Sequence, residues 1–181
     1  MKKLNWNHLL PYAALPVICI AFWLIRGSRM EMFPQLLAEL LLIFGYIAAL
    51  VDFLEKRVPN SLIGAMLGAW ILAMVPQMFF HTEQAIELLF SGVVGALVGG
   101  VVFLVVYVVS RKGLGGGDVK LMAISGLYLG IDGVLPAMLY GSVLSAVTAG
   151  VLVLLKKIGR KDAIPLVPFL YIGMVLTMLI G

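Results

Sequence analysis

Two short acidic motifs in apolar surroundings carry the residues that could do chemistry. One is Gly115-Gly116-Gly117-Asp118, between two apolar stretches, and the other is Asp52, at the end of a further apolar stretch. An ionisable residue at membrane depth is costly and is a functional candidate by default. Two carboxylates that share a site cannot both ionise, so the charged one can activate a water molecule while the protonated one polarises a carbonyl. The pair therefore predicts an aspartic peptidase that works inside a membrane.

The residues around Asp118 could shape such a site. Gly115 and Gly117 lack a Cβ, which would let irregular backbone approach closely and pair with an extended substrate, whose amides need partners inside a membrane. Lys120 could extend its amine towards the lipid headgroups or orient a carboxylate, and its position favours the first interpretation. A glycine-rich turn before a helix could also bind phosphate, but residues 115–120 lack the P-loop spacing.

The residues after Asp52 suggest a local break in the chain. Pro59 and Asn60 could interrupt the helix, with the asparagine amide satisfying freed backbone groups. Simpler interpretations stay open: Asp52 as a helix-end residue in the interface, and Asp118 as the N-cap of the following helix. Glu39, in the middle of an apolar stretch, could contact a basic partner or mark a proton path. The alternative function is therefore a small transporter or proton channel that uses the intramembrane acids.

The composition indicates an integral membrane protein. Of the 181 residues, 62% are hydrophobic and 12% are charged, against about a quarter charged in soluble domains. Several apolar stretches reach the roughly 20 residues that cross a bilayer. Cys19 is the single cysteine, and His8 and His81 are far apart in the sequence, so we expect no disulfide, no metal site and no cofactor. The net charge of +4 sets topology here and does not indicate nucleic-acid binding.

The predicted fold is all-α, a polytopic bundle of about six or seven membrane-spanning helices. Expected spans cover residues 9–25, 35–53, 60–80, 88–109, 118–130, 134–155 and 164–180. The stretch 118–130 is short for a full crossing, so it is either a half-helix or continues further. Residues 81–87 are polar and could begin an interfacial helix. Glycines four residues apart predict close helix packing at three places: Gly64 and Gly68, Gly95 and Gly99, and Gly126 and Gly130.

Charge placement predicts the orientation. Basic residues fall in alternate loops: Lys56, Arg57, Arg111, Lys112, Lys156, Lys157, Arg160 and Lys161. The intervening loops contain Glu83, Glu87 and Asp132 and no lysine or arginine. By the positive-inside rule the basic loops are cytoplasmic, so both aspartates should lie near the cytoplasmic side. The orientation of the first span stays open, since Lys2 and Lys3 compete with Arg26 and Arg29.

These motifs resemble a known family. Gly115-Gly116-Gly117-Asp118 matches the GxGD signature of the type IV prepilin peptidases, a family of intramembrane aspartyl proteases, and Val119-Lys120-Leu121 continues it. Asp52 followed by Pro59-Asn60 resembles the family's first aspartate and its Pro-Asn or Pro-Asp pair. The stretch 164–170 (IPLVPFL) resembles the proline-rich start of the last helix, with Val167 where many members have glycine. The resemblance implies that Asp52 and Asp118 are the catalytic pair.

The resemblance covers about residues 36–181, so we expect a peptidase membrane domain over 35–181 and an additional span over 1–34 outside the family core. It implies an aspartic endopeptidase of the bacterial inner membrane that cuts the basic leader from type IV prepilin or pseudopilin precursors at the cytoplasmic face, in type IV pilus assembly or protein secretion. These precursors and membrane lipid are the expected partners, and the oligomeric state stays open. Presenilin-like enzymes pair their GxGD aspartate with a Tyr-Asp element, whereas Leu50-Val51 precede Asp52 here.

Long members of this family carry an added cytoplasmic domain with paired cysteines and also methylate the new N-terminus. This sequence has neither that domain nor those cysteines. We therefore expect a short, peptidase-only form, for which N-methyltransferase activity is doubtful.

Overall fold

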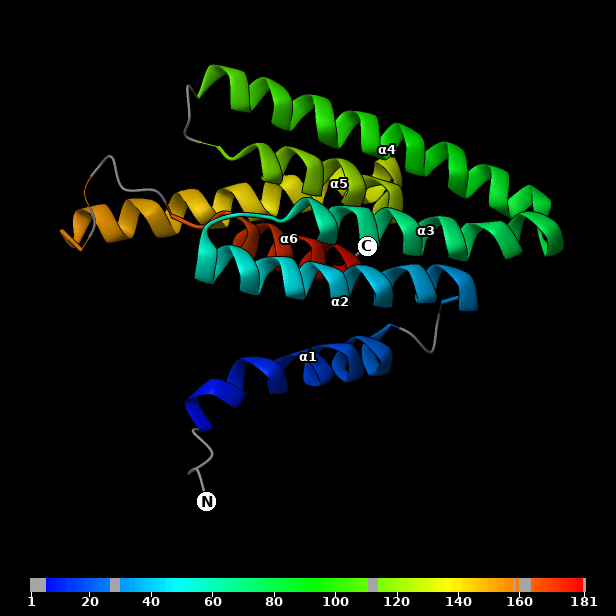
Figure 1. Ribbon diagram of the computed structural model, residues 1–181, viewed down its shortest axis with the longest axis horizontal. Helices are drawn as coiled ribbons and strands as arrows, with labels where there is room; N and C mark the ends of the chain where they lie inside the picture. Colours follow the sequence, from blue (N-terminus) through cyan, green and yellow to red (C-terminus); the bar gives the residue numbers. More distant parts are fainter. Residues whose placement is uncertain (1–5, 27–29, 111–113, 158, 160–163, 181) are drawn as a thin grey trace.

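The computed structural model describes residues 6–26, 30–110, 114–157, 159 and 164–180, and it confirms the predicted all-α bundle. Its helices are α1 (Trp6–Ile25), α2 (Met32–Glu55), α3 (Asn60–Phe80), α4 (Thr82–Val109), α5 (Gly116–Leu154) and α6 (Val167–Ile180) (Figure 1). Within the described residues, α2, α3, α4 and α5 are long and apolar enough to cross a membrane. The chain is a multi-pass membrane protein.

Helix α5 consists of two limbs that run in opposite directions (Figure 1). The limbs meet at Gly130, whose φ of 66° and ψ of −176° interrupt the helix. Glycine suits this bend because positive φ is costly for other residues, and an added Cβ would lie 2.5 Å from Ser91 Oγ. The Ile131 N–H donates to that same oxygen over 3.3 Å, which ties the bend to α4. The predicted short stretch 118–130 is therefore a half-helix that ends at Gly130.

Helix α4 packs against the first limb of α5 with backbones in contact. A Cβ at Gly95 would lie 2.6 Å from the Gly126 carbonyl oxygen and 2.6 Å from the Gly130 carbonyl carbon. A Cβ at Gly99 would lie 2.7 Å from the Met122 carbonyl oxygen. The predicted close packing at these two glycine pairs is confirmed, because small residues let membrane helices approach closely.

The same expectation is wrong for Gly64 and Gly68 on α3. An added Cβ at either position would meet no described atom within 4 Å. Helix α3 instead packs through larger side chains, and its buried residues are Met66, Trp70, Met74 and Gln77. The spacing of glycines thus identifies a helix face made of small residues, but it does not show whether another helix packs against that face.

Two boundaries differ from the sequence-based expectation. Residues 82–87 belong to α4, which begins at Thr82 directly after a one-residue break at His81, so the predicted separate interfacial helix is absent from the described chain. Glu83 in the first turn of α4 favours a helix start there, since acidic residues stabilise helix N-termini. Helix α6 begins at Val167 and not at 164, which places Pro168 in its first turn, where a proline is tolerated.

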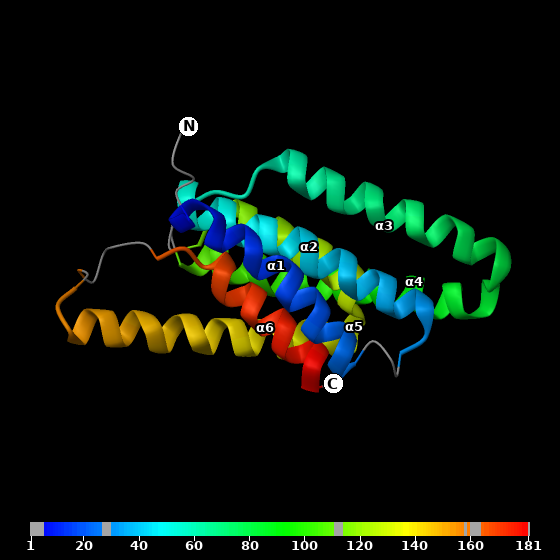
Figure 2. The ribbon, with the colours of Figure 1, turned by 90° about the horizontal axis from the view of Figure 1, so that it is seen from below.

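Helix α6 lies between α2 and the second limb of α5. Glycines allow both contacts: a Cβ at Gly45 would lie 2.9 Å from a Tyr171 ring carbon, and a Cβ at Gly141 would lie 2.7 Å from the Leu170 Cα. The rings of Tyr46 and Tyr171 pack edge to face with centroids 5.8 Å apart, a favourable aromatic geometry. Both views show the start of α6 at the end of the bundle where α2 ends and α5 begins (Figures 1 and 2).

Most of the described basic loop residues lie at one end of the bundle, whereas Arg26, after α1, lies at the other end. Lys56 and Arg57 follow α2, and Lys156 and Lys157 follow α5, at the end where α2 stops and α5 begins (Figure 1). Glu83 begins α4, at the opposite end. The other predicted basic loop residues lie outside the described residues: Lys2, Lys3, Arg29, Arg111, Lys112, Arg160 and Lys161. The division into segments 1–34 and 35–181 stays a prediction.

We expect Gly95→Ala to lower the free energy of unfolding by about 1–3 kcal/mol, the usual cost of overpacking. The new methyl group would meet backbone atoms that cannot rotate away. Gly68→Ala is the matched control, and it should be neutral or stabilise by up to about 1 kcal/mol, because alanine is the better helix former. Denaturant unfolding in detergent micelles, followed by circular dichroism, measures both. Equal unfolding midpoints for the two variants would contradict the described packing.

Candidate active site

Asp118 occupies the third position of α5, and its carboxylate folds back onto the start of the helix. The Gly115 N–H donates to Asp118 Oδ2 over 2.9 Å, and the Asp118 N–H donates to the Gly115 carbonyl over 3.1 Å. This is the reach-back contact of a capping box. Gly115 is the N-cap residue, so the interpretation of Asp118 as the N-cap is wrong. The Asp118 side chain is buried, with 8% of the residue exposed.

The glycines before Asp118 provide room for a neighbouring loop. A Cβ at Gly117 would lie 3.0 Å from Val58 Cβ and 3.3 Å from Val58 N, whereas a Cβ at Gly116 would meet no described atom within 4 Å. A Cβ at Gly115 would lie 3.1 Å from Asp118 Oδ2. Gly117 thus lets the α2–α3 loop pack against the start of α5. Val58 is a site residue that the sequence reasoning missed.

Asp52 lies in the last turn of α2 and is only 5% exposed. The Val167 N–H donates to Asp52 Oδ2 over 3.1 Å, and the Leu166 N–H also interacts with this carboxylate. The C-terminal end of a helix disfavours negative charge, whereas the N-terminal end of α6 favours it. Asp52 is thus a helix-end residue, as the simpler interpretation had it, and its burial shows that it faces the interior of the bundle.

The sequence reasoning missed the two amides at the start of α6. A signal for them exists in the stretch 164–170, because Pro165 and Pro168 carry no N–H. Leu166 and Val167 between them therefore provide the free amides at this helix start, where the first N–H groups have no partner within the helix. Nothing in the sequence identifies Asp52 as the acceptor.

The structure brings the two predicted aspartates together. Both carboxylates are buried at the same end of the bundle, and the charge of Asp52 acts on Asp118. Each also receives at least one backbone N–H from the start of a helix. Two acids that share a site can divide one proton between them, which is the state that acid–base hydrolysis needs.

Lys120 and Asn60 connect α5 to the start of α3. The Lys120 amine donates to Asn60 Oδ1 over 2.8 Å, and Lys120 is exposed. Lys120 therefore does not orient a carboxylate in this structure, and the Asn60 oxygen accepts a bond from Lys120 where we expected it to satisfy freed backbone groups. Pro59 interrupts the chain as predicted: it is the N-cap residue of α3, and its carbonyl accepts from Leu62 over 3.1 Å.

Glu39 lies apart from the aspartate pair. It precedes Asp52 by 13 positions on α2, which corresponds to about 20 Å along a helix. Its Oε1 accepts from Gln35 Nε2 over 3.0 Å, and with Gln77 of α3 it lines a cavity of about 410 Å³. This separation argues against a relay in which all three acids hold one ion.

Comparison with known proteins assigns the class. The chain matches the type IV leader peptidase family over residues 39–150, a range that contains both aspartates. Because this range is more than half of the chain, the protein belongs to the type IV leader peptidase family. This confirms the resemblance drawn from the motifs, and it favours a peptidase over a transporter.

Two curated relatives are similar to this chain. A "Prepilin leader peptidase/N-methyltransferase" of Bacillus subtilis (strain 168) is 26% identical over 177 residues, which cover 97% of this chain and 67% of the relative. A protein with the same description from Xanthomonas campestris pv. campestris is 27% identical over 128 residues, covering 68% of this chain and 42% of the relative. No solved structure matches the chain.

We expect Gly117→Ala to lower kcat/KM for peptide cleavage about tenfold, since sub-ångström displacement of positioned groups is costly in catalysis. The new methyl group would push the Val58 loop away from the start of α5. Gly116→Ala, one position earlier in the same helical turn, adds the same methyl group where nothing described opposes it and should keep its activity. Steady-state rates on one peptide substrate compare the two. Similar losses in both variants would show that the Val58 contact is irrelevant.

We expect Lys120→Ala and Asn60→Ala each to lower activity by a similar factor of about two to ten, the worth of one hydrogen bond. The double variant should be no worse than either single variant, because both changes remove the same bond. Lys157→Ala, at the same end of the bundle, is the control and should retain full activity. A double-mutant cycle on kcat/KM measures the coupling, and additive losses would show that the bond does not link the two helices functionally.

Proposed function

We propose that this protein is a membrane-embedded aspartic endopeptidase that removes the leader from type IV prepilin or pseudopilin-like precursors, with Asp52 and Asp118 as its catalytic pair. The observation that supports this most directly is the burial of both carboxylates at the same end of the bundle, near enough for the charge of Asp52 to act on Asp118. The family to which the chain belongs and the names of its two relatives supply the substrate class.

The proposed mechanism divides acid and base roles between the two aspartates. With one proton on the pair, the ionised carboxylate takes a proton from a water molecule while the protonated one hydrogen-bonds the scissile carbonyl oxygen. The water oxygen bonds to the carbonyl carbon, and the proton taken from water then passes to the leaving nitrogen as the C–N bond breaks. The anchored oxygen of each carboxylate fixes its orientation. Asp118 Oδ1 has no hydrogen-bond partner among the described residues, so it is available to the water or the substrate.

The proposed location is the bacterial inner membrane, with the aspartate pair near the cytoplasmic face. The basic residues Lys56, Arg57, Lys156 and Lys157 at that end of the bundle support this orientation, because cytoplasmic loops are enriched in lysine and arginine. By the same rule a basic leader stays cytoplasmic, and its junction with an apolar helix would lie at the depth of the pair. Membrane lipid surrounds the exposed apolar faces of the bundle.

We expect Asp52→Asn and Asp118→Asn each to lower leader cleavage at least about a hundredfold, the usual scale of acid–base contributions. The double variant should be little worse than either single one, since the pair acts as a unit. The measurement is the mobility shift of a precursor co-expressed with each variant, with elution of the purified protein as the check on folding.

Glu39→Gln serves as the matched control, because Glu39 is a second acid of the same helix far from the pair. Its cleavage rate should stay within about twofold of wild type, the usual range for a change outside the reacting groups. Processing that survives either aspartate change would refute the proposed pair. Loss of processing in Glu39→Gln together with proton flux in liposomes would favour the channel.

A further inference from the structure

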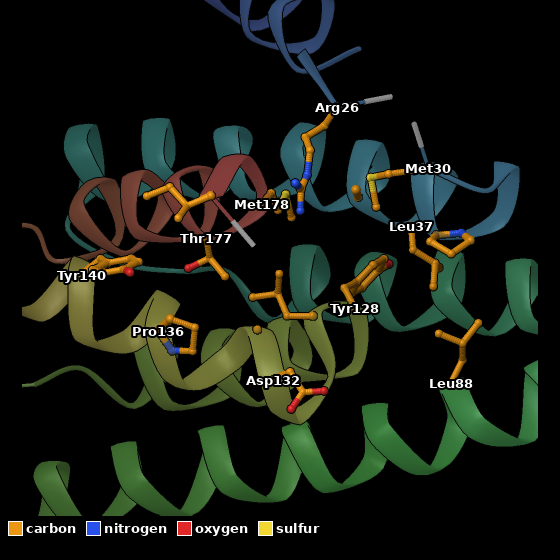
Figure 3. A pocket seen from close by; sticks show the side chains of 15 residues that line it. Arg26, Met30, Leu37, Leu88, Tyr128, Asp132, Pro136, Tyr140, Thr177 and Met178 are labelled. Carbon is orange, nitrogen blue, oxygen red and sulfur yellow. The ribbon is translucent and has the colours of Figure 1, made fainter. Parts of the chain in front are cut away.

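A cavity of about 450 Å³ lies at the end of the bundle opposite the aspartates (Figure 3). It is bounded by the ends of α1 and α6, the beginning of α2 and the bend of α5. Most of its lining is apolar and includes Leu37, Leu88, Leu129, Pro136 and Met178. Its volume falls within the usual range for small-molecule sites, about 300–1,000 Å³. Neither the aspartate pair nor the proposed cleavage uses it.

Two residues of opposite charge are among those that line this cavity. The Arg26 side chain reaches in from the end of α1, and Asp132 lies on the opposite wall, just after the bend of α5 (Figure 3). They are the two charged residues of the lining. In the described part of the chain neither side chain has a hydrogen-bond or ion-pair partner. A ligand that carries one anionic and one cationic group could therefore pair with both side chains.

Three residues with hydroxyl groups also belong to the lining: Thr177, Tyr128 and Tyr140. Thr177 Oγ1 donates to the Gly173 carbonyl over 2.9 Å within α6, and the Tyr128 hydroxyl donates to the Met66 carbonyl. Both are therefore engaged with the bundle itself. A ligand would therefore meet one cation, one anion, the Tyr140 hydroxyl and an apolar wall.

We propose that this cavity binds the phosphoethanolamine head of a zwitterionic glycerophospholipid. The phosphate would pair with Arg26, whose guanidinium matches phosphate oxygens with two parallel hydrogen bonds. The ammonium group would donate to the Asp132 carboxylate, and the first part of the acyl chains would follow the apolar lining. A phosphoglycerol headgroup would place no cation against Asp132, and a phosphocholine headgroup has no N–H to donate to it. The Asp132 carboxylate would therefore favour phosphoethanolamine over both other headgroups.

Native mass spectrometry of the whole protein tests this assignment. The purified protein is equilibrated with micelles that contain equal amounts of phosphatidylethanolamine and phosphatidylglycerol, and the retained lipid is counted and identified. Wild type should retain one lipid, with phosphatidylethanolamine favoured about tenfold, the scale of one charge-assisted hydrogen bond. Asp132→Asn should abolish this preference, and Arg26→Gln should reduce retention of both lipids. Glu83→Gln and Lys157→Gln are charge-matched controls outside the cavity and should behave like wild type.

Each variant is first shown to elute and unfold like wild type, so that loss of lipid is not loss of fold. Retention that is the same in wild type, Arg26→Gln and Asp132→Asn would overturn the proposal. Displacement of the lipid by an equal concentration of soluble glycerophosphoethanolamine would also overturn it, because the site would then recognise a free head and not a lipid. Retention of a precursor peptide in place of the lipid would overturn it as well. The readout is independent of peptidase activity.

Discussion

The structure depends on backbone N–H groups that hold two carboxylates at the beginnings of two helices. Buried carboxylates are tolerated only with hydrogen bonds, and Asp118 and Asp52 receive theirs from Gly115 and Val167. Both donors belong to helix ends, where N–H groups have no partner within the helix and the dipole favours negative charge. The same contacts hold one oxygen of each acid in place, so the start of α5 and the start of α6 fix the two carboxylates at one end of the bundle.

The bend at Gly130 makes this arrangement possible. A straight α5 of 39 residues would extend about 58 Å, nearly twice the thickness of a bilayer's hydrocarbon core of about 30 Å. Because the second limb runs back, the chain returns to the end where Asp52 lies, and α6 can begin beside it. The glycine contacts between α4 and the first limb fix the position of the bend, since Gly95 meets both Gly126 and Gly130.

The sequence predicts the helices and the two acids well, because apolar length and buried charge leave strong local signals. It also offers a short limb before Gly130 as one of two alternatives for this stretch. It cannot predict contacts between segments that are distant in the sequence. These are the hydrogen bond from the Val167 N–H to Asp52 and the packing of Val58 against Gly117. The hydrogen bond from Lys120 to Asn60 is a third such contact. Spacing likewise cannot distinguish the packed pair Gly95 and Gly99 from Gly64 and Gly68, which face open space, since both pairs form the same small stripe on a helix.

The donor to Asp52 is the main-chain N–H of Val167, so the hydrogen bond places little restriction on the side chain at this position. Every residue type except proline supplies that N–H, so exchanges at position 167 leave the anchor of the acid intact. The valine found here, where many related peptidases carry glycine, is thus a neutral difference for this hydrogen bond. The requirement at this position falls on the path of the backbone, which the flanking prolines and the packing of α6 impose, and not on the side chain.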